Sequence, residues 1–152
     1  MNGDVPKPID MRLIFFCVLL LSAILMQSCS RSFEAIDYGK DACGHCRMTI
    51  MDDRYAAEMI TQKGKVYKFD DVICMIQFGQ GQGDTEGSLF YVEDYLKKKD
   101  GALEVEEAVF LKSEFFSSPM NGNYAAFASA EDATRLKDSL GAERFKWSDI
   151  RR

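Results

Sequence analysis

The chain has 152 residues, 24 of them acidic and 19 basic, which gives a formal net charge of −5. A mildly acidic chain with no basic cluster argues against nucleic-acid binding. The length suits one domain, or two very small halves, with a modest hydrophobic core.

An apolar segment near the N-terminus, residues 13–26, predicts a secretory signal. It is shorter than the roughly 20 residues that a membrane span needs, and it follows Arg12. It leads to Ser28-Cys29, which resembles the lipobox of bacterial lipoproteins. The alternative is a plain membrane anchor followed by an ordinary cysteine.

We therefore expect a lipoprotein signal over residues 1–28 and a lipid on Cys29. Met11-Arg12 is a better start for such a signal than Met1, because Asp4 and Asp10 are unusual before an apolar segment. The lipid would hold the protein on the cell membrane or outer membrane, facing the periplasm. Removing residues 1–28 takes away two basic and two acidic residues, so the net charge does not change.

The first half of the mature chain predicts a polar tether and then a strand, strand, helix, strand order. Residues 29–41 are polar and mixed, and we expect them to form the lipidated tether. Residues 55–61 and 65–69 predict a hairpin, and a further strand is predicted at 89–92. Between them, Asp70 or Asp71 can cap a helix that ends in the glycine-rich residues 79–84.

The second half repeats this order. Strands are predicted at residues 107–111, 124–128 and 144–147, and an amphipathic helix at 131–140 that ends at Gly141. The predicted fold is α+β, with two small ββαβ-type modules at residues 42–92 and 93–152.

Cys43 and Cys46 form a Cys-x-x-Cys pair that encloses His45, the only histidine of the chain. Three interpretations compete: a structural zinc site, a dithiol redox centre and a soft-metal site for Cu(I). A zinc site needs four ligands, and only Cys74 and His45 could complete it.

The redox interpretation predicts the pair at the N-terminus of a helix, after a buried strand. The residues before Cys43 are polar, and Pro119 is the only proline after the signal that could serve as the cis-proline of such folds. The sequence around the pair therefore does not match that pattern well.

Thioether side chains favour the Cu(I) interpretation. Met48 lies two residues after Cys46, and Met120 lies in a loop rich in Pro, Asn and Gly. A thioether stays available to Cu(I) where thiols are oxidised, and thiolates with thioethers select Cu(I) over hard ions. Cys74, Asp70 and His45 are further candidates, as metal ligands or as groups that tune the site from outside.

Together these motifs resemble the NosL family, the copper-binding accessory lipoproteins of nitrous oxide reductase. The resemblance rests on Cys43-x-x-Cys46-x-Met48, Phe69-Asp70-Asp71-x-x-Cys74-Met75, Pro119-Met120 and Trp147. The usual family pattern has glycine before the methionine, where this chain has Arg47.

The resemblance implies a fold similar to the small ββαβ modules of organomercurial lyases. It also implies a periplasmic protein that binds Cu(I) and passes it to a copper recipient or a copper-loading transporter complex. No enzymatic activity is expected, because the chain has no Ser/His/Asp set and no phosphate-binding loop. A periplasmic thiol–disulfide oxidoreductase using Cys43 and Cys46, and a zinc-stabilised adaptor, remain the alternatives.

Overall fold

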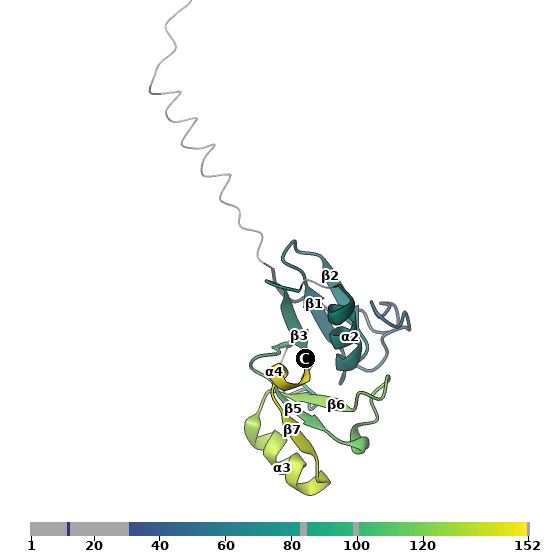
Figure 1. Ribbon diagram of the computed structural model, residues 1–152, viewed down its shortest axis with the longest axis vertical. Coiled ribbons are helices and arrows are strands. Elements are labelled where there is room, and N and C mark those ends of the chain that lie inside the picture. The colour runs from purple at the N-terminus through teal and green to yellow at the C-terminus, as the bar shows by residue number, and fades with distance from the viewer. Residues whose placement is uncertain (1–11, 13–30, 83–84, 99–100, 152) are drawn as a thin grey trace, which may run out of the picture. The chain divides into compact units, whose positions relative to one another are not determined.

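The computed structural model describes residues 12, 31–82, 85–98 and 101–151 (Figure 1). The expected signal and Cys29 lie outside the described residues. From Arg31 onward the chain forms two small antiparallel sheets with helices, the α+β fold that the sequence predicts. Within the described residues, no helix has both the length and the apolar character needed to cross a bilayer.

The first sheet has the strand order β2-β1-β3-β4. Its strands are β1 (Ala57–Ile60), β2 (Val66–Phe69), β3 (Leu89–Val92) and β4 (Leu103–Glu104). The predicted hairpin is confirmed, with Ala57 opposite Phe69 and Ile60 opposite Val66. β1 lies in the centre of the sheet, and all four of its side chains are buried.

Helix α2 (Val72–Gln82) follows β2 directly. The Oδ1 atom of Asp71 accepts a hydrogen bond from the Ile73 N–H at 3.0 Å, so Asp71 satisfies a free backbone donor of the first turn. The helix continues through Gly79 and Gly81 and ends at Gln82, within the glycine-rich segment where its end is predicted. A helical glycine costs only about 1 kcal/mol relative to alanine, which a helix can accommodate in its last turns.

The second sheet has the order β6-β5-β7. It contains β5 (Val109–Lys112), β6 (Tyr124–Phe127) and β7 (Glu143–Phe145), with the short helix η1 (Glu114–Phe116) after β5. Helix α3 (Ala130–Leu140) begins after the Ser129 cap and ends at Gly141, whose φ of 61° is left-handed as predicted. The last predicted strand is shorter than expected, because Trp147 begins helix α4 (Trp147–Ile150).

The two halves of the chain share a sheet and a hydrophobic core, which the sequence does not predict. β4 lies in the predicted second module, yet it pairs with β3 of the first sheet. Val105, Phe110, Trp147 and other residues of the second half belong to the same core cluster as β1 and α2. The expected boundary between residues 92 and 93 therefore does not divide the packing.

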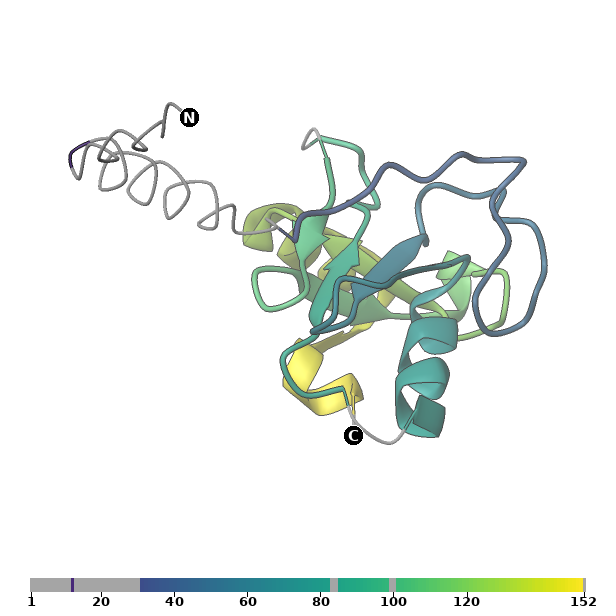
Figure 2. The ribbon, with the colours of Figure 1, turned by 90° about the horizontal axis from the view of Figure 1, so that it is seen from above.

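Residues 31–41 are not the free tether that their composition predicts. In Figure 2 this blue segment is an irregular loop, and it packs on the first sheet. Arg31 Nη1 donates hydrogen bonds to the carbonyl oxygens of Thr61 (3.2 Å) and Gly87 (2.7 Å), and Ile36 is buried. A few apolar side chains among polar residues are enough to attach an irregular segment once a sheet offers a partner surface.

Candidate metal centre

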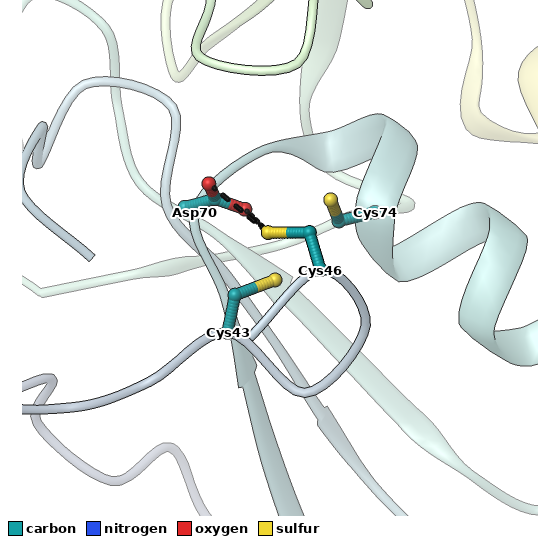
Figure 3. Close-up of side chains that lie close together, drawn as sticks. All are labelled: Cys43, Cys46, Asp70 and Cys74. Atoms are coloured by element: carbon teal, nitrogen blue, oxygen red, sulfur yellow. Dashed lines mark hydrogen bonds between the residues drawn. The ribbon is translucent and has the colours of Figure 1, made fainter. Parts of the chain in front are cut away.

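Four side chains meet at the start of α2: Cys43, Cys46, Asp70 and Cys74. One donor atom from each lies within 4.8 Å of the donor atoms of the others. Figure 3 shows Cys43 and Cys46 on one loop, Cys74 on α2 and Asp70 just before that helix. We call this set the cysteine cluster.

The loop that carries Cys43 and Cys46 is a tight turn closed by its own backbone. The Cys43 N–H donates to the Met48 carbonyl at 2.8 Å, and the Arg47 N–H donates to the Cys43 carbonyl at 3.1 Å. The Gly44 N–H reaches the Lys68 carbonyl of β2 at 2.8 Å. A Cβ at Gly44 would lie 3.2 Å from the Phe69 ring, so a glycine lets the loop approach β2 closely.

Arg47 has a φ of 68°, in the left-handed region. A residue with a Cβ costs roughly 1–2 kcal/mol there, whereas glycine does not. The family's usual glycine at this position is thereby explained, and Arg47 keeps the same turn at some cost in backbone energy.

Asp70 and Cys74 reach the cluster because β2 ends at Phe69 and α2 begins two residues after Asp70. Cys74 lies in the first turn of α2 and is completely buried, as is Cys43. The thiol of Cys46 donates to the carboxylate of Asp70, with Sγ 3.5 Å from each of the two oxygens. The N-terminus of α2 favours negative charge here, so it helps to stabilise a thiolate.

The three thiols differ in acidity. A hydrogen bond from the Cys74 thiol lowers the pKa of Cys43 to about 6. Donating this hydrogen bond raises the pKa of Cys74, and burial raises it further. Burial also raises the pKa of Cys46. Cys43 is therefore the most acidic of the three thiols.

The predicted thioether ligands are more exposed than the thiols. Met48 is 55% exposed and Met120 is 37% exposed. The segment of Met48 is bonded to Cys43, whereas the segment of Met120 is bonded to Asp71, the neighbour of Asp70. The backbone N–H of Met120 donates to Asp71 at 3.0 Å, and the carbonyl of Met48 accepts from Cys43. His45 is exposed, and it is not among the cluster donors.

Sequence reasoning missed how firmly the second half is attached beside the cluster. Ser118 Oγ donates to Asp71 Oδ2 at 2.6 Å, and Ser118 itself is buried. The sequence signal was a turn-rich segment, residues 117–123, whose Ser and Asn side chains suit backbone-capping turns. That local pattern does not predict Asp71 as the hydrogen-bond acceptor of Ser118.

The donor set is chemically soft. Three sulfurs suit ions such as Cu(I) or Zn²⁺, whereas Mg²⁺ and Ca²⁺ prefer oxygen ligands. The Cys43–Cys46 pair lies in a turn and not at a helix N-terminus, so the arrangement differs from that of thioredoxin-like redox centres.

Comparison with known proteins identifies the family of the chain. The family model NosL matches residues 36–152. The fold is similar to the crystal structure of the copper chaperone NosL from Shewanella denitrificans, with a TM-score of 0.69 and 18% sequence identity over 80% of this chain and 96% of that chain. No curated protein sequence matches this chain. The family match covers both sheets and the cysteine cluster, and the chain therefore belongs to the NosL family.

Proposed function

We propose that this protein binds one Cu(I) at the cysteine cluster and transfers it to a copper-accepting partner. The observation that carries the proposal is the convergence of three cysteine sulfurs within 4.8 Å in the family's sequence setting. The copper chaperone with the similar fold supports the same metal. The role is binding and transfer and not catalysis.

The proposed sulfur ligands differ in solvent exposure, and this difference supports a role in Cu(I) transfer. The sulfurs of Cys43 and Cys74 belong to fully buried residues, Cys46 is partly exposed, and Met48 is more than half exposed. We propose that the thiolates hold the ion and that the thioethers of Met48 and Met120 act as exchange ligands at the surface. Thioethers suit this role because they bind Cu(I) without needing to lose a proton.

We further propose that the accepting partner serves the copper-site maturation of nitrous oxide reductase, either as the recipient or as a copper-loading transporter complex. A lipid on Cys29 would keep the protein on the membrane, facing the periplasm.

Arg31 and the cysteine cluster lie at opposite ends of β1. Arg31 is hydrogen-bonded to Thr61, just beyond the Ile60 end of β1. The cysteine cluster lies at the other end of β1, where Ala57 pairs with Phe69. The four residues of β1 cover about 10 Å, so Arg31 and the cysteine cluster are separated along this strand.

The copper proposal is tested by competition against a chromogenic Cu(I) chelator under reducing, anaerobic conditions. We expect about one equivalent bound by the parent protein, weaker binding in Cys43→Ser, and weaker binding in Met48→Leu. Met51→Leu is the matched control, because Met51 is 70% exposed and outside the motif.

A different outcome would point to one of the other interpretations. Tight Zn²⁺ binding without Cu(I) binding would favour a zinc-stabilised adaptor. Reduction of insulin disulfides that requires Cys43 and Cys46 and ignores Met48, again without Cu(I) binding, would favour an oxidoreductase.

A further inference from the structure

Asp71 is a buried carboxylate beside the cluster that contributes no donor to it. It follows Asp70 directly and has no exposed surface. Its Oδ2 atom accepts from the hydroxyl of Ser118 at 2.6 Å and from the N–H of Met120 at 3.0 Å, while Oδ1 accepts from the N–H of Ile73. Three hydrogen-bond donors therefore converge on the two oxygens of this one carboxyl group.

The segment that Asp71 holds, residues 118–123, is itself internally fixed. We call it the Met120 loop. The Asn123 N–H donates to Ser118 Oγ at 2.8 Å, and the Ser118 N–H donates to Asn123 Oδ1 at 3.1 Å. The backbone of Gly122 lies so close to α2 that a Cβ there would be 2.7 Å from Ile73 Cβ and 2.9 Å from Asp71 Oδ1.

We propose that Asp71 is a positioning residue that places Met120 as the copper ligand supplied by the second half of the chain. The inference rests on the proposed copper function. Asp71 acts through the backbone amide of Met120, because its Oδ2 holds that amide and the Ser118 hydroxyl at the same time. The neighbouring aspartates thus divide their roles: Asp70 contacts Cys46, and Asp71 contacts the Met120 loop.

Two variants disturb this positioning by different means. Asp71→Asn removes one acceptor oxygen and brings an N–H₂ group toward groups that are already donors. Gly122→Ala changes no polar group, and its Cβ would push the Met120 loop away from Ile73. Gly81→Ala is the matched control, because a Cβ at Gly81 would have no neighbour within 4 Å.

The experiment measures Cu(I) affinity and the ¹³C methyl resonances of methionine in the reduced protein. Met120→Leu assigns the Met120 methyl signal and defines the loss that follows when this ligand is missing. We expect Met120→Leu, Asp71→Asn and Gly122→Ala each to weaken Cu(I) binding by about tenfold or more, as removal of a supporting group around a metal does. We also expect the Met120 methyl signal to stop responding to Cu(I) in the two positioning variants.

Double variants separate positioning from general destabilisation. If Asp71 and Gly122 act through Met120, adding Met120→Leu to either variant should weaken binding no further. Additive losses, or a Met120 methyl signal that still shifts with Cu(I) in both variants, would overturn the inference while leaving copper binding intact. No Cu(I) binding by the parent protein would instead overturn the proposed function, and this inference with it.

Discussion

The thiol of Cys46 lies 3.5 Å from both carboxylate oxygens of Asp70. A neutral thiol can donate to this carboxylate, whereas a thiolate would be repelled by it. Burial raises the pKa of Cys46, and the negative charge of Asp70 raises it further. Asp70 therefore favours the protonated form of Cys46, the most exposed thiol of the cluster.

Asp70→Asn should tighten Cu(I) binding near neutral pH. The amide can donate to a thiolate, so the pKa of Cys46 falls and protons compete less with the metal. Each unit by which this pKa falls is worth up to about tenfold in affinity. Chelator competition at neutral and at alkaline pH measures the effect, which should shrink at alkaline pH. Weaker binding in the variant at both pH values would mean that Asp70 is itself a ligand.

Cys74→Ala should raise the pKa of Cys43. The thiol of Cys74 donates the hydrogen bond that contributes most to lowering the Cys43 pKa to about 6. Without that donor, Cys43 should titrate closer to the usual range of a thiol, about 8.5. The measurement is the ultraviolet absorbance of the thiolate against pH in metal-free protein, with Cys46→Ala in both samples as a common background. An unchanged first titration would show that Cys74 does not stabilise this thiolate.

Glu58 should make the stability of the metal-free protein depend on pH. Its side chain is completely buried in β1, with Oε1 accepting from the Glu34 N–H at 3.0 Å, and Oε2 has no partner among the described residues. Burial raises the pKa of Glu58 from 4.5 to about 7. The folded protein therefore binds more protons than the unfolded chain between these values, and its free energy of unfolding falls as the pH rises through this window.

The contribution of Glu58 is at most about 3 kcal/mol, from the size of the pKa change. Urea unfolding of the parent protein and Glu58→Gln across this pH range measures it. Glutamine cannot ionise, so the difference in stability between the two proteins should change in favour of Glu58→Gln as the pH rises. Parallel curves for the two proteins would show that Glu58 does not titrate in this range.

Local patterns predicted the elements that form through local interactions. The hairpin of β1 and β2 and the Gly141 end of α3 follow from alternation, turn residues and capping, all of which act over a few residues. The pairing of β4 with β3 and the packing of residues 31–41 depend on surfaces brought together by the whole fold. No local pattern encodes those contacts.

The same distinction applies to the metal centre. Cys43 and Cys46 were recognisable because a tight loop brings both thiols together within four residues. Cys74 is harder to assign from sequence, because a buried cysteine in a helix is also an ordinary core residue. The packing of α2 against the loop brings Cys74 into the cluster, and the sequence does not show that packing. The exposure of Met48 and Met120 likewise depends on tertiary contacts, which the sequence motifs do not contain.

Lipidation of Cys29 is tested independently of copper. Mass spectrometry of membrane-extracted protein should find a diacylglyceryl group on Cys29 at the new N-terminus, because an apolar segment ends just before Ser28-Cys29. Cys29→Ser should prevent that modification. Cys43 and Cys46 serve as the internal control, because both should remain unmodified in either protein. Mature protein that retains residues 1–28 would contradict the lipoprotein prediction.

X-ray absorption at the copper edge tests the central claim most directly. The parent protein loaded with one equivalent of Cu(I) should show a first shell of sulfur scatterers without imidazole nitrogen, since His45 lies outside the cluster donors. Cys43→Ser and Cys74→Ser should each lose part of that sulfur signal. A first shell dominated by nitrogen or oxygen, or one that is unchanged in both cysteine variants, would contradict copper binding at the cysteine cluster.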